Sequence, residues 1–324
     1  MKLHRFLVTL LAATCTTFAQ LPLTANAQEL PDRTVRLVVP FAAGGGVDAL
    51  ARPFAIELGK ALQRTVVVEN KASTTGQIGT AEVAKSPADG TTLVISSAAF
   101  GTTPSFVPKL PYDIFKDFEP VTILAATPQV LVAPVGFKAN SFAEVLAMAR
   151  SNGQVNVALP GSSGIQRLAT ELLISTAQIQ VTKVPYKGAG AAFTDLIAGR
   201  VDVMFDNPGS SMVHVNSGRL KVLASTGSKR LLTLPQVPTV AETYPGFEAL
   251  NWFIVAAPAG TPPAILDRLN EASAQALRSD AMRQVLERDG LQPLANSRTQ
   301  AQQFLRSEFN KWDRIVRDKQ LTAD

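Results

Sequence analysis

The sequence predicts an α/β fold of two lobes that are joined by two crossing strands and enclose an interdomain cleft. Three observations support this fold class. Short apolar strands alternate with helical patterns through much of the chain, which is typical of largely parallel sheets covered by helices. Two longer apolar runs, at 118–133 and 249–257, interrupt this alternation. Two of the predicted strands run into turns that are rich in glycine.

The first 27 residues have the features of a signal peptide. A basic start that includes Lys2 and Arg5 precedes an apolar segment at 6–13, and Ala25-Asn26-Ala27 fits a small-x-small cleavage site. The apolar segment is too short for a membrane anchor, and the residues before Cys15 make a poor lipobox. We expect cleavage after Ala27 and export to the periplasm, with retention of the amino terminus as the alternative.

Cleavage would change both the cysteine content and the charge of the chain. Cys15 is the only cysteine, so a hydrophobic core must stabilise the mature protein without disulfides. Loss of Lys2 and Arg5 lowers the formal net charge from +5 to +3. The remaining basic residues are dispersed and aromatic residues make up 6% of the chain, so we expect no binding to nucleic acid.

Strands and helices follow one another in a regular order. Each strand is an apolar run, and most junctions contain glycine or proline. The predicted strands are Thr34–Pro40, Thr65–Glu69, Thr91–Ser96, Val155–Ala158, Gln180–Pro185, Val201–Phe205 and Leu220–Ala224. The predicted helices are Asp48–Leu62, Ile78–Lys85, Phe142–Ser151, Gly164–Thr176, Ala189–Ala198 and Gly209–Asn216. A last helix starts at Ser297, which forms a capping box with Gln300, and its aromatic stripe predicts core packing.

The two apolar runs that interrupt this order are predicted to cross between the lobes. Phe118–Ala126 and Gln129–Ala133 are separated by Thr127-Pro128, and Ala249–Ala257 follows a proline-rich stretch. The first predicted lobe then contains 28–125 and 250–324, and the second contains 126–249. Two crossing strands would permit hinge bending.

The turn after the first strand is suited to hold an anion. Its glycines allow another group to approach the backbone closely. The free N–H groups of the helix that begins near Asp48, together with the helix dipole, favour a negative charge there. The residues expected to contact a ligand are Phe41, Ala43, Gly44, Gly45, Gly46 and Asp48.

A second turn of this type follows the strand Val155–Ala158. It contains Gly161, Ser162, Ser163 and Gly164, whose two hydroxyls either bind a ligand oxygen or cap the next helix. Ligands of open α/β sheets bind at the carboxyl ends of strands. One such turn in each predicted lobe therefore indicates a shared site.

Three more strand ends are expected to line the same cleft. They carry Ser97, Ala98, Thr102, Tyr186, Lys187 and Asp206. Asp206 either accepts from a ligand or caps the following helix, and Lys187 either pairs with an anion or stays solvated. Apolar walls are expected from Phe41, Phe100 and Trp252.

Catalytic motifs are weak. His214 is the only histidine after cleavage and lies within a predicted helix, and the second turn does not match G-x-S-x-G. The glycines of the first turn lack GxGxxG spacing, and one histidine without cysteine disfavours a zinc-type site. We expect no enzyme, cofactor or metal. The alternative is an exported serine hydrolase that uses Ser162 or Ser163 with His214.

Motifs along the whole mature chain carry a family resemblance. They are Pro31-Asp32-Arg33, Val38-Val39-Pro40-Phe41 with Gly44-Gly45-Gly46 and Asp48, Val67-Val68-Glu69-Asn70-Lys71, Pro87-Ala88-Asp89-Gly90, Asp117-Phe118-Glu119-Pro120-Val121, Val184-Pro185-Tyr186-Lys187-Gly188, Val201-Asp202-Val203-Met204-Phe205-Asp206 and Ala256-Ala257-Pro258-Ala259-Gly260-Thr261-Pro262. With these motifs the chain resembles the Bug family of extracytoplasmic solute receptors, the substrate-binding components of tripartite tricarboxylate transporters.

The resemblance implies a two-lobed periplasmic binding protein that closes on a small organic carboxylate, such as a dicarboxylate, an amino acid or an aromatic acid. In the family, turns like Phe41–Asp48 and Gly161–Gly164 clasp one carboxylate through backbone N–H groups, hydroxyls and water. The resemblance also implies delivery to a separate membrane permease, and we expect a monomer. A sensory receptor for a membrane kinase is an alternative role.

The chain departs from the family pattern at two places. Ala72-Ser73-Thr74-Thr75-Gly76 replaces a turn rich in proline and glycine, and Arg167-Leu168 replaces His-Leu. Arg167 either adds a cation near the cleft or lies on the surface.

Overall fold

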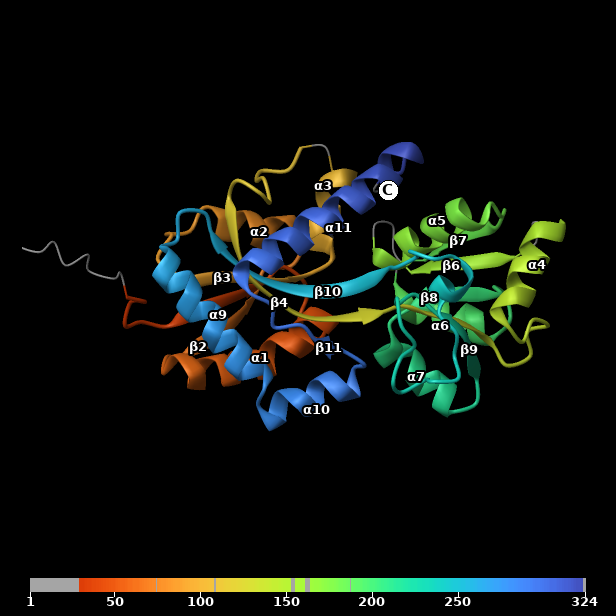
Figure 1. The fold of residues 1–324 in the computed structure, drawn as a ribbon, viewed down its shortest axis with the longest axis horizontal. Helices are drawn as coiled ribbons and strands as arrows, with labels where there is room; N and C mark the ends of the chain where they lie inside the picture. The colour runs from red at the N-terminus through yellow and green to blue at the C-terminus, as the bar shows by residue number, and fades with distance from the viewer. Residues whose placement is uncertain are drawn as a thin grey trace, which may run out of the picture.

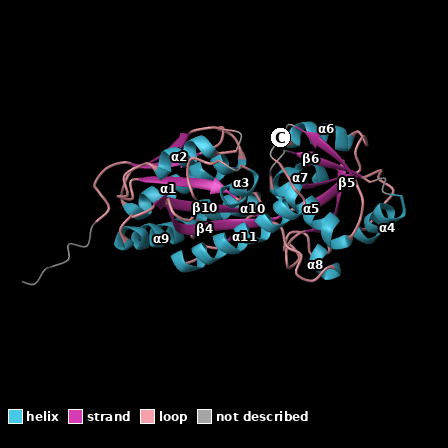
Figure 2. Cartoon of the chain, turned by 90° about the horizontal axis from the view of Figure 1, so that it is seen from above, coloured by secondary structure: helices cyan, strands magenta, loops and turns pink. Residues whose placement is uncertain are grey.

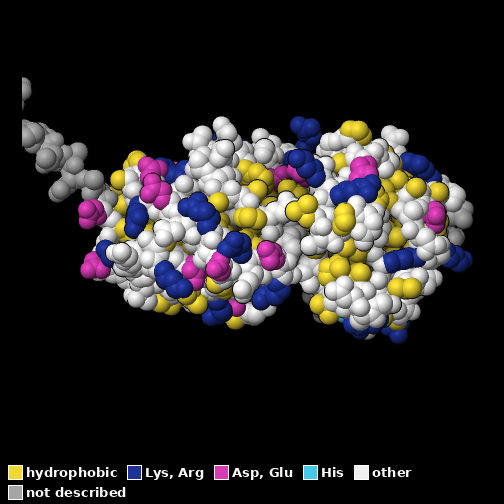
Figure 3. Space-filling model, turned by 60° about the horizontal axis from the view of Figure 1, so that its bottom comes forward, with side chains coloured by type: hydrophobic (Ala, Val, Ile, Leu, Met, Phe, Trp, Pro, Cys, Tyr) yellow, Lys and Arg dark blue, Asp and Glu magenta, His cyan; other side chains and the backbone are white. Residues whose placement is uncertain are grey.

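Two mixed sheets, each covered by helices, form the two lobes of the protein (Figures 1 and 2). The computed structural model describes residues 29–322 except 74, 108, 153–154, 161–163 and 187. The expected signal peptide and its cleavage site lie outside the described residues. Within the described part of the chain, no helix is long and apolar enough to cross a membrane. The space-filling view shows two masses that are joined at a narrower waist (Figure 3).

Lobe one is built on a six-stranded sheet with the order β11-β4-β10-β3-β1-β2. Its strands are β1 (Val35–Val39), β2 (Val66–Asn70), β3 (Thr92–Ser97), β4 (Phe118–Pro128), β10 (Leu250–Pro258) and β11 (Gln292–Pro293). Its helices are α1 (Gly46–Leu62), α2 (Gln77–Ala84), α3 (Ala99–Phe106), α9 (Pro263–Leu277) and α10 (Asp280–Arg288). The first three strands are parallel to one another, as the alternating pattern predicts.

Lobe two is built on a five-stranded sheet with the order β7-β6-β8-β5-β9. Its strands are β5 (Val130–Pro134), β6 (Asn156–Pro160), β7 (Thr182–Tyr186), β8 (Val203–Asp206) and β9 (Leu220–Ser225). Its helices are α4 (Phe142–Asn152), α5 (Ile165–Ala177), α6 (Ala189–Ile197), α7 (Pro208–Asn216) and the short α8 (Val240–Thr243). Here β6, β7 and β8 form the parallel part of the sheet.

The strands next to the hinge run antiparallel to their neighbours, so the sheets are mixed rather than largely parallel. In lobe one, β10 pairs antiparallel with both β3 and β4. In lobe two, β5 pairs antiparallel with β8 and β9. The β3–β10 pair is antiparallel because the chain runs towards the hinge along β3 and away from the hinge along β10.

Thr226 ties the two crossing segments together. Its backbone N–H donates to the carbonyl of Gln129 at 2.9 Å, and its hydroxyl accepts from the Gln129 N–H at 2.7 Å. Its own carbonyl accepts from the Ala249 N–H at 3.1 Å. Gln129 follows β4 and Ala249 precedes β10, so both passages between the lobes are held at one point.

The last helix, α11 (Arg298–Asp318), packs into the cores of both lobes. The expected capping box of Ser297 and Gln300 is confirmed. In its first half, Ala301 and Leu305 belong to a lobe-one cluster. In its second half, Trp312 and Val316 belong to the cluster under α4 and α5 of lobe two. Figure 1 shows α11 running from lobe one to the seam between the lobes.

Candidate functional site

The first glycine-rich turn presents an uncapped helix end. Gly45 is the N-cap of α1, with φ −78° and ψ 170°, and no side chain caps the helix. The first N–H groups of any helix lack partners within it. A Cβ added at Gly46 would meet no atom within 4 Å, so this side of the turn is open. The geometry is that of an anion site built from backbone N–H groups.

Asp48 fixes the shape of this turn from inside. Its carboxylate accepts from the Gly44 N–H at 2.8 Å, from Arg52 Nε and Nη2 at 2.9 Å each and from Asn70 Nδ2 at 2.9 Å. Burial by itself would raise the pKa of Asp48, but these donors outweigh it and lower the pKa to about 2. Gly44 has φ 80°, a conformation that favours glycine. Asp48 therefore positions the turn, and its contact with a ligand remains a prediction.

A second layer of contacts holds the strand that leads into the turn. Asn70, at the end of β2, also donates to the carbonyl of Phe41 at 3.1 Å. The Phe41 ring packs beside Gly76, where an added Cβ would lie 3.1 Å from its Cζ. Gly76 is the N-cap of α2, so the position of α2 supports Phe41.

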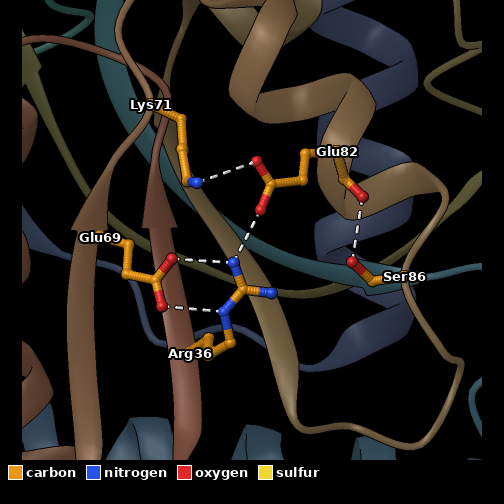
Figure 4. Close-up of polar contacts among 5 residues, drawn as sticks. All are labelled: Arg36, Glu69, Lys71, Glu82 and Ser86. Carbon is orange, nitrogen blue, oxygen red and sulfur yellow. Dashed lines mark hydrogen bonds and ion pairs between the residues drawn. The ribbon is translucent and has the colours of Figure 1, made fainter.

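Four charged side chains bind α2 to the edge of the lobe-one sheet (Figure 4). Arg36 of β1 makes two hydrogen bonds of 2.8 Å to Glu69 of β2 and one of 2.7 Å to Glu82 of α2. Lys71 Nζ lies 3.4 Å from the other oxygen of Glu82. Because this network spans two strands and one helix, it holds α2 against the strands that flank the turn.

The second turn leads into a helix end of nearly the same geometry. Gly164 is the N-cap of α5, with φ −79° and ψ 168°, and again no side chain caps the helix. The two units are β1–α1–β2 and β6–α5–β7, each with a parallel strand pair, and both helices end in a left-handed glutamine, Gln63 or Gln178. Gly161, Ser162 and Ser163 lie outside the described residues.

Asp206 is buried beside the start of α5. Its carboxylate accepts from the hydroxyls of Ser210 and Ser211, the latter at 3.1 Å, and from the side chain of Gln166 in the first turn of α5. Only 1% of the residue is exposed, and this burial raises the pKa of the carboxyl despite its donors. The strand end therefore places an acceptor group next to the second helix end.

Three amide side chains at the hinge were not predicted as site residues. Asn207 Oδ1 accepts from Gln129 Nε2 at 2.9 Å and from Asn251 Nδ2 at 3.2 Å. Asn207 follows Asp206, whereas Gln129 and Asn251 belong to the two crossing segments. In the sequence, Gln129 and Asn251 look like single polar interruptions of apolar runs, and only the tertiary pairing brings them to Asn207.

Two other strand ends differ from the expected pattern. The segment from Ser97 to Thr102 is not an open turn, because α3 begins at Ala99 and both Ala98 and Thr102 are buried at 2% exposure. The Tyr186 hydroxyl donates to Asp195 Oδ2 at 2.8 Å within lobe two. Burial, followed by this bond, raises the pKa of Tyr186. Lys187 lies outside the described residues.

The expectation that Phe100 and Trp252 form apolar walls is wrong. Phe100 is 3% exposed and contacts Phe118 edge to face, and Trp252 is fully buried in the same lobe-one cluster. Both side chains are needed to fill the space between the sheet and the helices α3 and α11.

Arg167 faces the neighbouring lobe. Its Nη1 donates to the carbonyl of Thr322 at 2.9 Å, and its guanidinium lies 6.0 Å from the ring centre of Phe106 of α3. Arg167 therefore helps to seat α5 against α3 and the end of α11.

The environment of His214 offers no support for a catalytic triad. The centre of its ring lies 4.4 Å from the centre of the Phe193 ring, and burial lowers the pKa of His214. Its buried Nδ1 has no hydrogen-bond partner in the described part of the chain. Among the described residues, no group of three or more His, Cys, Asp or Glu side chains is arranged to hold a metal ion.

Comparisons with known proteins agree with this geometry. The model of the tripartite tricarboxylate transporter family receptor matches residues 50–321. The chain is similar to the solved periplasmic binding protein BugD, with 31% identity and a TM-score of 0.75 over 90% of this chain and 99% of that one. It is similar to Rpa4515 of R. palustris, solved with adipate, with 34% identity and a TM-score of 0.77 over 89% and 98%. It is also similar to MatC of Rhodopseudomonas palustris, solved with malate, with 32% identity and a TM-score of 0.74 over 88% and 99%.

Proposed function

Because this chain belongs to the family of tripartite tricarboxylate transporter receptors, we propose that it captures one small organic carboxylate between its lobes and hands it to a separate membrane permease. The family is one of periplasmic binding proteins, and its members are receptors rather than enzymes. The alternative of an exported serine hydrolase is therefore wrong. In this proposal the protein acts as an exported monomer.

The observation that carries the proposal is the pair of glycine N-caps at α1 and α5. In both helices the N-cap glycine has extended dihedral angles and no side chain caps the first N–H groups, and each helix follows the carboxyl end of a parallel strand. Two such ends that converge on one carboxylate would give it several backbone donors and two favourable dipoles. The ligand contacts proposed on this basis are Phe41, Ala43 to Gly46, Gly161 to Gly164 and the hydroxyl groups among them.

The ligands of two relatives support the carboxylate class. Rpa4515 was solved with adipate and MatC with malate, and both ligands are dicarboxylates. We propose the same chemical class for this chain, since the uncapped starts of α1 and α5 offer the backbone donors that a carboxylate requires.

A side chain placed on the open face of the first turn tests this site. Gly46→Val adds bulk where an added Cβ meets no atom within 4 Å, so the fold should tolerate it while a ligand loses access to the backbone. We expect calorimetry with succinate, malate and adipate to show at least about 10-fold weaker binding, the equivalent of about 1.4 kcal/mol. Gly136→Val is the matched control, because Gly136 lies in lobe two in equally open space. Equal affinity of the Gly46→Val variant and the wild type would exclude the proposed clasp.

A further inference from the structure

We propose that the carboxyl-terminal segment 298–322, here called the strap, is a third connection between the lobes and limits their movement. The strap stays packed against both lobes, so the lobes separate only on the opposite side of the seam, between α7 and α10. This inference rests on the proposed function, because capture of a ligand between two lobes requires them to move. It predicts which distances change when a carboxylate binds.

The strap begins in the core of lobe one. Ala301 and Leu305 of α11 are 0% exposed and share a cluster with Val38 of β1 and with side chains of α3. Farther along α11, Lys311 Nζ donates to the carbonyl of Glu248 at 3.3 Å. Because Glu248 lies just before β10, the strap contacts one of the two crossing segments before it reaches lobe two.

The second half of the strap is packed into lobe two. Trp312 and Val316 are at most 3% exposed and belong to the cluster under α4 and α5. After the end of α11, the half-buried Leu321 packs against the same cluster. The carbonyl of Thr322 accepts from Arg167 Nη1 of α5 at 2.9 Å. Separation of the lobes on this side would expose these apolar side chains to water, which is unfavourable.

Helix α10 lies on the other side of the seam. Successive side chains of a strand point to opposite faces of its sheet. The strap shares its lobe-one cluster with Val38 of β1. Helix α10 instead contributes Met282 and Leu286 to a cluster that contains Leu37 and Val39 of the same strand. Figure 1 accordingly shows α11 above the crossing strands β4 and β10, and α10 and α7 below them.

The contact between α7 and the end of α10 has no anchor of this kind. Gly209 at the start of α7 lies close to the backbone of Asp289, and Gly290 lies close to the ring of Pro208. The carboxylate of Asp289 accepts from Arg288 of its own lobe at 2.8 Å. Within the described residues, no hydrogen bond or ion pair joins α7 to α10. A contact of glycine, proline and backbone buries little apolar surface, so it separates more readily than the strap does.

The lobes should therefore rotate about the strap. Packed cores resist gradual deformation, so domains move at hinges while the interfaces beside these hinges stay packed. We expect the gap between α7 and α10 to widen in the ligand-free protein and to narrow when a ligand binds. Over the same change, α11 should keep its contacts with α5.

Distances between spin labels, measured by pulsed electron paramagnetic resonance, test the direction of this movement. Cys15 is the only cysteine of the chain, so Cys15→Ser leaves the introduced pair as the only thiols. The first pair is Glu287→Cys on α10 with Val213→Cys on α7, and the second is Gln303→Cys on the strap with Ser175→Cys on α5, all at exposed positions. Whichever of succinate, malate and adipate binds in calorimetry should shift the first distance by more than about 2 Å and the second by less than about 1 Å.

A variant with a weakened strap should release the second distance. Ile315→Ala with Val316→Ala removes one half-buried and one buried apolar side chain from the lobe-two cluster. The matched control is Val145→Ala with Met148→Ala, which makes an equivalent change in the same cluster on α4, at the end of lobe two far from the seam (Figure 1). The ligand should shift the second distance by more than about 2 Å in the strap variant and by less than about 1 Å in the control.

A thermal melt shows whether the strap variant folds. If it does not, Leu321→Ala at the end of the strap takes its place, with the same expected shift of the second distance. A second distance that stays fixed in the folded strap variant would overturn the inference.

Each remaining outcome also decides the proposal. A wild-type protein in which a bound acid shifts both distances, neither of them or only the second would overturn this inference and leave the carboxylate receptor intact. Failure of every tested acid to bind in calorimetry would overturn the proposed function together with the inference.

Discussion

Trp252 and Trp312, the two tryptophans of the chain, donate their indole N–H groups to the same oxygen of Glu308, at 3.0 and 2.9 Å. Trp252 lies on the crossing strand β10, and Trp312 belongs to the core cluster of lobe two. The other oxygen of Glu308 accepts from Lys311. One buried carboxylate thus links a passage between the lobes to the helix that packs against both.

Loss of the Glu308 carboxylate should destabilise the protein strongly. Glu308→Ala leaves two buried indole donors without an acceptor, and each unsatisfied group costs about 1–3 kcal/mol. We expect the free energy of unfolding, measured by urea denaturation, to fall by about 3 kcal/mol in total. Glu287→Ala, at an exposed position of α10, serves as the control. A loss below about 1 kcal/mol would contradict the proposed importance of the shared contact.

Asp48 should make stability depend on pH in the acid range. Its pKa is about 2 in the folded protein, below the ordinary value of 3.8, so folding favours the carboxylate form. The stabilisation is therefore fully present above about pH 4 and is lost as the pH falls through 2. Comparison of wild type with Asp48→Asn by chemical denaturation between pH 2 and 6 isolates this contribution from those of the other acids. We expect the difference to shrink towards low pH, and a constant difference would refute the assignment.

The network of Arg36 with Glu69 and Glu82 should contribute modestly and in a salt-dependent way. About a third of each of these side chains is exposed, so solvent screens the ion pairs. Arg36→Met should lower the free energy of unfolding by about 1 kcal/mol at low salt and by less at 1 M NaCl. Lys60→Met removes a single ion pair with Glu57, in which the lysine side chain is 68% exposed, and should have a smaller effect. Equal effects of the two substitutions, or no dependence on salt, would argue against a cooperative network.

The two lobes also touch where α7 meets the end of α10. A Cβ on Gly209 would lie 3.3 Å from the Cα and the carbonyl oxygen of Asp289, and one on Gly290 would lie 3.2 Å from the Cβ of Pro208. Gly209→Val should therefore hold the lobes apart and weaken ligand binding about 10-fold without contacting the ligand. Calorimetry measures this loss, and Gly136→Val, in open space elsewhere in lobe two, serves as the control. Wild-type affinity in the Gly209→Val variant would show that this contact does not limit binding.

The sequence predicts the local features of the fold better than its tertiary pairings. The apolar runs locate most strands, and Ser297 with Gln300 marks the start of the last helix, because these signals depend on neighbouring residues alone. Strand direction is not local, so the alternating pattern predicts largely parallel sheets although β5 and β10 run antiparallel to their neighbours. Local propensity does not predict helix α3, because Thr102, Thr103 and Pro104 are poor helix formers, yet burial of Thr102 and Thr103 against lobe one stabilises the helix.

The same distinction applies to the candidate site. The glycine N-caps of α1 and α5 follow from residue types that are visible in the chain. The burial of Trp252, the internal partners of Asp48 and Tyr186, and the meeting of Gln129 with Asn207 and Asn251 depend on contacts between distant residues. Sequence patterns indicate that Trp252 is apolar but not which surface it packs against.

The position of the two indoles has a spectroscopic consequence. Both sit at one joint between β10 and α11, so intrinsic emission should follow the polarity of that joint rather than the occupancy of the cleft. If the lobes rotate while the packing of α11 against β10 is unchanged, tryptophan emission should not change during a ligand titration. An extrinsic dye, attached to a cysteine introduced on α7, would sense the same movement directly.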